Sequence, residues 1–505
     1  MKNFKQKFTT YLKGRNFSSS LLVAIVIAAV VFVNVIIYTL SSVFPLYIHS
    51  GEKTDTSISA ACDLLFDEPI RLGRKVTITF CSYENDVAAH STGKFVYDTA
   101  KQFEERYPDF IDVRFVNVLT KLDSEGNSIA DELETYSKKE GTVIDANSVI
   151  FSTETEYKVI TDVVTGTGYI DFYTVDESGY ITSYNGEEVF ASSVMWVLEE
   201  EHGKAYFTVG HGETASTHLY SILVSAGYDV EEINLRKSDV PEDCELLVIS
   251  NPTADFERGT TESALITEYD RLMAYSKRGG NFMVFIDPMM KKLPVLESFV
   301  GGFGISFNED EAGERWLVQE LTNAITLDRF AFVTDYADNE LSADILATLE
   351  KRTENPDGHV FINKAASLAL TGRAKPLLIS SSSSVCQAGG KTVDGAGGYT
   401  VAAYSTAENE SASDAKLFFM SEAMITASDA ILTESYSNKD FLFSLFDNFF
   451  DKGDMPYGCR TVLYEEDLLE NLTVGTTITV TVVLLALPVI IAVCGAVILV
   501  RRKNR

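Results

Sequence analysis

Two long apolar segments near the ends of this 505-residue chain constrain its fold more than any other feature. The first contains the run LLVAIVIAAVVFVNVIIYTL, in which Asn34 is the only strongly polar side chain, and the second contains ITVTVVLLALPVIIAVCGAVILV. About 20 apolar residues in a helix span the ~30 Å hydrocarbon core of a bilayer. Pro488 is compatible with this assignment, because membrane helices accommodate proline better than soluble helices do. We therefore predict transmembrane helices over residues 21–43 and 476–500.

Basic residues flank both segments on their outer sides. Residues 1–20 carry five Lys or Arg and no acid, and residues 501–505 carry four Lys or Arg. The positive-inside rule therefore predicts a cytoplasmic tail at each end and places residues 44–473 outside the cytoplasm. A cleaved signal peptide is the alternative for the first segment. Its apolar run is longer than that of a usual signal peptide, however, and no small-x-small cleavage site follows it.

The region between the two segments is strongly acidic. The whole chain has 73 Asp and Glu against 42 Lys and Arg, a formal net charge of -31, and nine of the basic residues lie in the two tails. Such a surface repels nucleic acid and anionic headgroups, so we expect no nucleic-acid partner.

The six cysteines are scattered, at positions 62, 81, 244, 386, 459 and 494. No two of them form a C-x-x-C pair, so the sequence indicates neither a zinc framework nor an evident disulfide framework. A single bridge in the exported region is left open, and the sequence does not choose its partners. We expect no metal and no cofactor.

The pattern over residues 74–185 predicts a strand, a helix and a strand, followed by antiparallel strands. KVTITFC alternates apolar and polar residues, GKFVYDTAKQFEERYPD has helical spacing, and IDVRFVNV is the second strand. SVIFST, YKVITDVV and YIDFYTV then predict antiparallel strands. This is the element order of a thioredoxin-like domain. Thioredoxin chemistry needs a C-x-x-C pair, and Cys81 stands alone, so we expect a scaffold without redox activity.

Residues 186–455 have the pattern of a second α/β domain. The strands AYFTVG, CELLVIS and NFMVFIDP alternate with helices, and unbroken apolar strands are typical of a sheet covered on both faces. The alternation predicts a parallel sheet with helices on both sides. Residues 309–400 are expected to form a less regular insert, NKDFLFSLFDNFF a final helix, and residues 456–473 a linker.

Polar turns follow the predicted parallel strands, in YFTVGHGE, LLVISNP and FMVFIDP. The carboxyl ends of parallel strands meet at one edge of a sheet, where ligands usually bind. LISSSSS and FFMSEA are expected to end at the same edge. The predicted crevice there is lined by His211, Glu213, Asn251, Asp287, Ser381, Ser421 and Glu422.

Three functional interpretations of this crevice compete with a structural one. The first is metal-assisted hydrolysis, because H-x-E also occurs in zinc deaminases; those enzymes need a P-C-x-x-C motif as well, and this chain has none. The second is nucleophilic catalysis, but the chain has no G-x-S-x-G elbow, and Cys244 precedes its strand instead of following it. The third is the binding of a ligand or of a partner segment.

In the structural interpretation, Gly210 and Gly212 supply positive φ angles for a turn. Glu213 and Asp287 then accept backbone N–H groups near the helices that follow, and His211 is the side chain expected to face the crevice. The chain has no G-x-x-x-x-G-K-[ST] motif, so a nucleotide-hydrolysing partner would be another chain.

The order of these motifs resembles that of a known family. YFTVGHGE, LYSILVSAGYDVEEINL, VPEDCELLVISNPTADF, YSKRGGNFMVFIDP and LFFMSEAMITASDA, followed by a proline-containing last helix, are similar to the GldG family of gliding-motility-associated auxiliary components of ABC transporters. The resemblance covers the chain from about residue 74 to its end. It implies a thioredoxin-like first domain and a second domain similar to class I glutamine amidotransferases and to a domain of an intraflagellar transport protein. The family lacks the catalytic cysteine of the amidotransferases, as this chain does. FFMSEA stands where many relatives have a Gly-Asp-Ser type of turn.

The resemblance also implies partners and a location. Many relatives are fused to an ABC permease or encoded beside one, and two membrane segments are too few for a permease of the chain's own. We therefore expect a two-pass cell-membrane protein that is not an enzyme. Its role would be that of an auxiliary subunit of an ABC-type transport or gliding-motility-like envelope complex, with permease and ATPase partners. The alternative is an extracytoplasmic envelope hydrolase or carbohydrate-binding protein that uses the same crevice.

Overall fold

The computed structural model describes most of the region between the two apolar segments. The described residues are 58–123, 126–140, 143–161, 169–175, 180–199, 202–214, 217–259, 266–321, 324, 328–353, 358–408, 413–422 and 436–463. They belong to one compact unit. Both predicted transmembrane segments, both basic tails and part of the predicted linker lie outside them. Among the residues described, no helix combines the length and the apolar character needed to cross a membrane.

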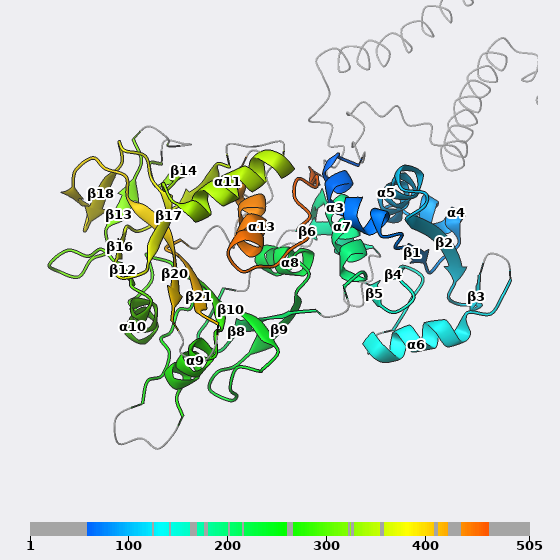
Figure 1. Cartoon of the computed structure of the whole chain (residues 1–505), viewed down its shortest axis with the longest axis horizontal. Coiled ribbons are helices and arrows are strands. Elements are labelled where there is room, and N and C mark those ends of the chain that lie inside the picture. The colour runs from blue at the N-terminus through cyan, green and yellow to red at the C-terminus, as the bar shows by residue number, and fades with distance from the viewer. Residues whose placement is uncertain are drawn as a thin grey trace, which may run out of the picture. The chain divides into compact units, whose positions relative to one another are not determined.

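The first domain contains the strand–helix–strand unit and the hairpin expected from the sequence (Figure 1). Its elements are α3 (Ala61–Arg71), β1 (Val76–Phe80), α4 (Glu84–Ala89), α5 (Gly93–Arg106), β2 (Ile111–Asn117), β3 (Leu122–Asp123), α6 (Ala130–Glu140), β4 (Val149–Ser152) and β5 (Tyr157–Ile160). The strand order is β3-β2-β1-β4-β5. β1 runs parallel to β2, because α5 returns the chain to the start of the sheet, and antiparallel to β4.

The strand expected at YIDFYTV begins later than its pattern indicates. Residues Ile170–Phe172 form a 3-10 turn, η1, entered through Tyr169 at φ +56°. Tyr169 and Phe172 are both buried, and a 3-10 turn brings residues three apart onto one side. The strand β6 (Tyr173–Val175) follows and forms a small sheet with β7 (Ile181–Tyr184) and β22 (Val462–Leu463).

The second domain is built on a nine-stranded mixed sheet. Its elements include β8 (Lys204–Thr208), α8 (Thr217–Ser225), β9 (Asp229–Ile233), β10 (Cys244–Ser250), α9 (Glu268–Lys277), β11 (Asn281–Phe285), α10 (Pro294–Gly302), β14 (Ala331–Tyr336), α11 (Glu340–Arg352), β15 (Val360–Asn363), β17 (Lys375–Ile379), β20 (Thr400–Ala407), β21 (Ala415–Met420) and α13 (Asn438–Asn448). The strand order is β15-β14-β17-β20-β21-β11-β10-β8-β9.

The expected parallel sheet is present in one half of this arrangement. The strands β21, β11, β10, β8 and β9 are mutually parallel. The strands β20, β17, β14 and β15 continue the sheet with antiparallel pairings. The region 309–400 is therefore more regular than its sequence indicates. It supplies β14, α11, β15 and β17 to the main layers, and also β13 (Leu317–Gln319), β16 (Leu368–Leu370), β18 (Val385–Ala388) and β19 (Lys391–Asp394). β16 pairs with β12 (Ile305–Phe307).

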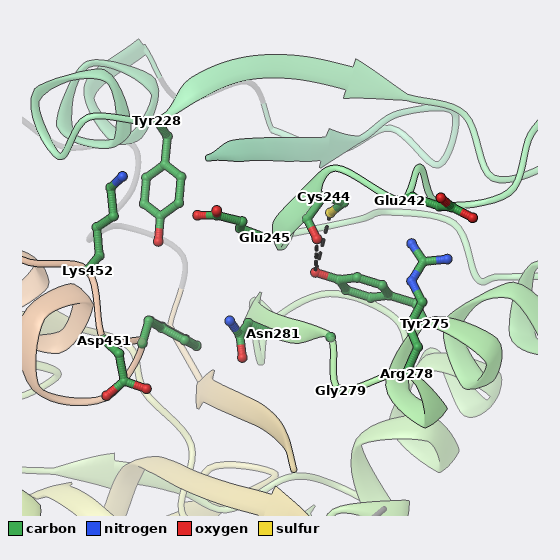
Figure 2. Close-up of a pocket in the computed structure, with 12 residues that line it drawn as sticks. Tyr228, Glu242, Cys244, Glu245, Tyr275, Arg278, Gly279, Asn281, Asp451 and Lys452 are labelled. Carbon is green, nitrogen blue, oxygen red and sulfur yellow. Dashed lines mark hydrogen bonds between the residues drawn. The ribbon is translucent and has the colours of Figure 1, made fainter. Parts of the chain in front are cut away.

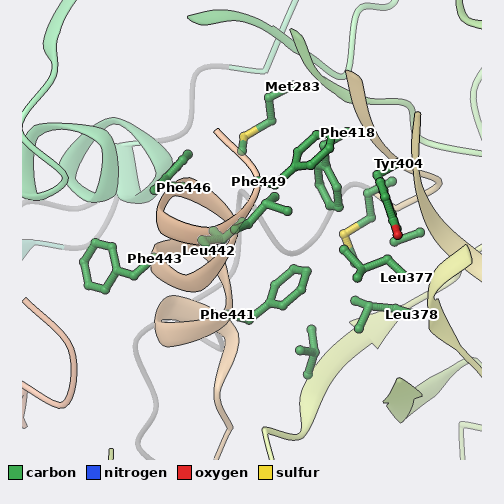
Figure 3. Close-up of a cluster of buried hydrophobic side chains, with 14 of the residues drawn as sticks. Met283, Leu377, Leu378, Tyr404, Phe418, Phe441, Leu442, Phe443, Phe446 and Phe449 are labelled. Atoms are coloured by element: carbon green, nitrogen blue, oxygen red, sulfur yellow. The ribbon is translucent and has the colours of Figure 1, made fainter. Parts of the chain in front are cut away.

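Helices cover both faces of the sheet, as the unbroken apolar strands predict. Alternate residues of β10 enter two separate cores: Leu246 and Val248 one, Leu247 and Ile249 the other. Helices α8, α11 and α13 contribute to the first core, and α9 and α10 to the second. Figure 3 shows part of the first core, where Phe441 and Phe446 of α13 point toward the sheet residues, among them Leu377 and Met283.

Helix α7 (Gly186–Trp196) carries two consecutive buried glutamates, and the first of them holds the ends of the described chain. Glu187 accepts hydrogen bonds from the backbone N–H of Ser59 at 2.8 Å and from that of Arg460 at 3.0 Å. β22, which follows Arg460, pairs with β7, which precedes the helix. The chain thus enters and leaves the described unit through the first domain.

The second glutamate of α7 binds the helices of the second domain. Glu188 accepts hydrogen bonds from Ser225 Oγ of α8 at 2.7 Å and from Lys439 Nζ of α13 at 2.6 Å. Both members of the ion pair are buried. Burial lowers the pKa of Lys439, but the charges of Glu188 and Asp440 outweigh it and raise the pKa above its ordinary value. The ammonium group therefore stays charged and compensates Glu188.

Replacing Lys439 with Met should destabilise the protein strongly. The substitution leaves the Glu188 carboxylate buried without its cation, which costs about 3 kcal/mol or more. Urea unfolding of the purified chain measures this loss. The control is Lys292→Met, which removes an ion pair of the same 2.6 Å length whose side chains are 45% and 29% exposed, and it should cost less than about 1 kcal/mol. Equal losses in the two variants would show that the buried Glu188–Lys439 pair stabilises the protein no more than an exposed ion pair does.

Candidate functional site

All seven residues predicted to form a site follow strand ends at one edge of the large sheet. The parallel strands β8, β10, β11 and β21 end there. β17 ends there too, because it is antiparallel to β20, which is antiparallel to β21. Backbone hydrogen bonds join successive strand ends: Thr214 N–H donates to Ser250 O, Asn251 N–H to Phe285 O, and Ile286 N–H to Met420 O. This common edge was predicted from the strand pattern alone.

The GHGE turn after β8 requires its two glycines. Gly210 has φ +115° and Gly212 has φ +69°, as predicted for a tight turn. A Cβ atom on Gly212 would lie 2.2 Å from Thr253 Oγ1. Thr253 reaches this position because its backbone N–H, like that of Ala254, donates to His211 O. The turn after β8 is thus fastened to the turn after β10.

The His211 imidazole is buried and bonded on both sides, so the expectation that it faces an open crevice is not met. Its side chain is fully covered. Nδ1 lies 3.2 Å from Glu213 Oε1, and Nε2 lies 3.0 Å from Glu268 Oε2. The ring also stacks on Phe256, with centroids 4.1 Å apart and an interplanar angle of 14°.

The two carboxylates favour the charged form of this histidine. Burial by itself lowers the pKa of His211, but the hydrogen bonds and charges of Glu213 and Glu268 outweigh it and raise the pKa. Burial raises the pKa of Glu213, and its bonds to the ring and backbone of His211 outweigh that effect and lower the pKa. Arg236 Nε lies 3.6 Å from Glu268 Oε1, so two cations face two anions.

This arrangement limits the chemistry of the turn. An imidazolium that donates both N–H groups to carboxylates has no lone pair with which to act as a general base. The carboxylates lie at opposite ring nitrogens, so the three groups do not converge on one cation. Among the described residues, no hydroxyl or thiol hydrogen-bonds to the ring. The turn is therefore a buried ionic cluster.

Glu213 acts within its own turn. Besides the ring contact, Oε2 accepts the backbone N–H of His211 at 2.7 Å. The sequence predicted that Glu213 accepts backbone N–H groups close to the following helix. The acceptor role is present, and its donor lies two residues before Glu213 instead. Residues 215–216, which precede α8, lie outside the described residues.

Asn251 and Asp287 follow the next two strands. Asn251 is buried and has φ +49°, a left-handed conformation that asparagine tolerates. Asp287 Oδ1 accepts the backbone N–H of Met289 at 2.8 Å, as expected for a carboxylate that stops a strand. The buried Arg315 guanidinium donates to the carbonyls of Asp287 and Pro288.

The Asp287 loop leaves two apolar side chains in solvent. Met289 is 58% exposed and Met290 is 45% exposed. They line a cavity of about 290 Å³ together with Lys291, Lys292, Glu314 and Arg315, and Lys292 and Arg315 are each paired with a carboxylate. The loop is thus an exposed apolar feature with charged neighbours.

The three remaining predicted residues form hydrogen bonds with residues of the region 309–400. Ser381 Oγ donates to Glu320 Oε1 at 2.7 Å, and its backbone N–H donates to Glu320 Oε2 at 3.0 Å. Ser421 Oγ donates to a backbone carbonyl at residue 366 at 2.5 Å. Glu422 Oε1 accepts the backbone N–H of Asn363 at 3.2 Å. Glu320, Ser421 and Glu422 are completely buried.

The structure therefore brings together some of the predicted residues and separates others. His211 and Glu213 are directly bonded, whereas Asp287, Ser381 and Glu422 each bind different neighbours. A binding role for the seven residues stays a prediction. Sequence reasoning missed Glu268 and Glu320, the buried carboxylates that hold His211 and Ser381, because no local pattern links residues so far apart in the chain.

Cys81, at the end of β1, occupies the place where thioredoxin chemistry would need a reactive thiol. It is completely buried, and burial raises the pKa of its thiol to about 12. A protonated, covered thiol is a poor nucleophile.

A larger cavity lies at the opposite, amino-terminal edge of the sheet. It has a volume of about 410 Å³ and a polar lining with charges of both signs, drawn in Figure 2. Cys244 Sγ donates to Tyr275 Oη at 3.3 Å, and Tyr275 Oη donates to the Cys244 carbonyl at 3.3 Å. Burial raises the pKa of Cys244 to about 12. The thiol is therefore held protonated beside the cavity.

Comparison with known proteins gives similarities of fold. No family model and no curated protein matches the chain. Among solved structures it is similar to the mmIFT52 N-terminal domain, with 13% identity over 50% of this chain and 99% of that one and a TM-score of 0.36. It is also similar to a ThuA-like protein from Bacteroides uniformis, with 11% identity over 48% of this chain and 89% of that one and a TM-score of 0.29.

A glutamine amidotransferase from Thermotoga maritima is similar as well, with 12% identity over 50% of this chain and 100% of that one and a TM-score of 0.28. The order of its own helices and strands makes the protein an α/β protein with a partly parallel sheet, and these likenesses are of fold alone.

Replacing His211 with Gln should cost stability in a pH-dependent way. The folded pKa is raised above the ordinary value of 6.5, so the stabilisation is fully present below about pH 6.5 and is lost as pH rises through the folded pKa. The difference in unfolding free energy between wild type and variant should be about 3 kcal/mol at pH 6 and smaller at pH 9. Urea unfolding at several pH values measures it.

Phe256→Leu is the matched control for this prediction. It removes the ring that stacks on His211 but keeps every charged member of the cluster and their hydrogen bonds, so its cost should vary much less between pH 6 and pH 9 than the cost of His211→Gln. A His211→Gln cost that varies with pH no more than the cost of Phe256→Leu would contradict a buried imidazolium.

Proposed function

We propose that the protein is a membrane-anchored, non-catalytic auxiliary subunit of an ABC-type transport or gliding-motility-like cell-envelope complex. In this proposal, two transmembrane helices hold an extracytoplasmic pair of domains. The pair binds a partner or ligand while permease and ATPase subunits on other chains perform transport. The strand order of the first domain supports this proposal, and so does the GHGE turn, which is one of the most specific parts of the resemblance to the GldG family.

The state of His211 is the observation that supports a non-catalytic role most strongly. The histidine of the GHGE turn has both nitrogens engaged by carboxylates, and its side chain is covered. A hydrolase at this edge would need a free base beside a nucleophile or a set of metal ligands. The buried cluster stabilises the turn instead of presenting a reactive group.

The path of the chain supports the membrane arrangement. The first described helix, α3, and the last described strand, β22, both belong to the first domain. The predicted transmembrane helices flank these segments in the sequence. We therefore propose that both connections to the predicted transmembrane helices leave from the first domain, and that the second domain meets the partner.

The exposed methionine loop is the surface proposed for this contact. Met289 and Met290 lie at the sheet edge predicted to bind, beside Lys291 and Lys292. Methionine side chains adapt to irregular partner surfaces, and exposed apolar groups with a charged rim are typical of protein contacts.

Labelling in intact cells tests the proposed topology. Thr155 is an exposed residue of the β4–β5 turn, and the native cysteines of the described region are buried. An impermeant maleimide should label Thr155→Cys before lysis and should label Lys503→Cys, in the basic tail, only after lysis. Labelling of Lys503→Cys before lysis and of Thr155→Cys only after lysis would contradict the proposed topology.

Co-purification tests the proposed partner surface. A double change of Met289 and Met290 to Glu should reduce the amount of ABC permease and ATPase recovered with the tagged chain by about tenfold, which corresponds to about 1.4 kcal/mol. Leu119→Glu is the control, because Leu119 is 86% exposed but lies in the first domain. Equal recovery from both variants would remove the methionine loop from the interface, and recovery of neither partner with wild type would reject the complex.

A further inference from the structure

Two cysteines from opposite ends of the described chain meet inside the first domain. Cys62 lies in α3, and Cys459 lies just before β22. They are 0% and 5% exposed and belong to the same hydrophobic core. The structure records both as thiols, and their Sγ atoms lie within 4.8 Å of each other and of a Glu187 carboxylate oxygen.

The carboxylate beside them is already satisfied by other donors. Glu187 Oε1 accepts Ser59 N–H at 2.8 Å and Ser59 Oγ–H at 2.6 Å, and Oε2 accepts Arg460 N–H at 3.0 Å. The Cys62 Sγ contact, at 3.6 Å, is the longest of the set. Glu187 would therefore keep three hydrogen bonds if Cys62 lost its proton.

The same three bonds make a metal ion the weaker explanation of this group. A structural zinc site usually has four ligands, mostly Cys and His, in tetrahedral geometry. Here three candidate ligands converge among the described residues. One of them is a carboxylate whose oxygens are occupied by N–H and O–H donors.

We propose that Cys62 and Cys459 form a disulfide bond in the exported protein. The two S–H bonds break, one S–S bond forms, and two protons are released. Two electrons pass to a disulfide-bearing oxidoreductase or to a small-molecule disulfide outside the cytoplasm. The proposal rests on the extracytoplasmic location proposed above, because cytoplasmic thiols are kept reduced.

The bond would close the exported unit where the chain enters and leaves it. Cys62 follows the first predicted transmembrane helix, and Cys459 precedes the second. A crosslink there restrains nearly the whole described chain, and long closed loops restrict the unfolded state most. It would reinforce the hydrogen bonds of Glu187 and the pairing of β22 with β7.

The environment of Cys459 indicates when the bond would form. Its hydrogen bond with Cys62 and its burial raise the pKa of the Cys459 thiol well above the ordinary value. Because both cysteines are buried in the folded unit and the thiolate is the reactive species, exchange with an external oxidant is slow once the core has closed. The bond therefore forms during folding, before α3 and the segment before β22 are covered.

Counting free thiols in the full chain tests the proposal. Membranes are dissolved in denaturant with a polyethylene-glycol maleimide, with and without prior reduction. The chain has six cysteines, so wild type should gain four labels without reduction and six after it. Cys62→Ser should gain five labels in both conditions, because Cys459 is released. Cys244→Ser, the control, should gain three without reduction and five after it.

Several results would overturn the disulfide. Six labels on unreduced wild type would exclude it, whether or not zinc is released on denaturation. If the unreduced chain carries four labels but runs as a dimer on a non-reducing gel, the disulfide joins two chains and the proposed bond within one chain is wrong. Labelling of Thr155→Cys in the same intact cells separates the two proposals: the maleimide count decides the bond, and the intact-cell labelling decides the location.

Discussion

The described structure depends on a pair of buried carboxylates in the first turn of α7. Glu187 binds the backbone at both ends of the described chain, and Glu188 binds Lys439 and Ser225 of the second domain. Burying two adjacent carboxylates is costly unless each finds strong donors. The helix N-terminus, a buried ammonium group and several N–H and O–H donors supply them. The same constraint explains why the last strand returns to the first domain, because only there can Arg460 reach Glu187.

The second domain also buries polar groups that need hydrogen-bond partners, at the carboxyl edge of its sheet. Its strand ends carry polar groups that need partners, and the fold provides internal ones: Glu213 and Glu268 for His211, and Glu320 for Ser381. The GHGE turn, whose histidine resembles a catalytic residue in the sequence, is therefore a buried corner of the fold. In the function proposed above, this corner would support the edge at which the exposed Met289 and Met290 meet a partner.

The sequence predicted the parts of this architecture that local patterns encode. Unbroken apolar runs identified β10 and β11 as central parallel strands, and turn glycines located Gly210 and Gly212 at positive φ. It did not predict β14 and β15, because their antiparallel pairings join short segments whose own patterns are weak. It also misplaced the His211 side chain. The burial of that ring depends on Glu268, which lies on α9 and carries no local signal of the contact.

ATP turnover by the partner complex tests the central claim most directly. The ABC ATPase and permease would be reconstituted in liposomes with and without this chain. The account predicts that the chain alone hydrolyses no ATP, and that adding it changes the turnover of the complex to the same extent for wild type and for a folded His211→Gln variant. Turnover that is unaffected by the chain would contradict an auxiliary role. A hydrolytic activity of the chain alone that His211→Gln abolishes would show that the buried cluster is an active site.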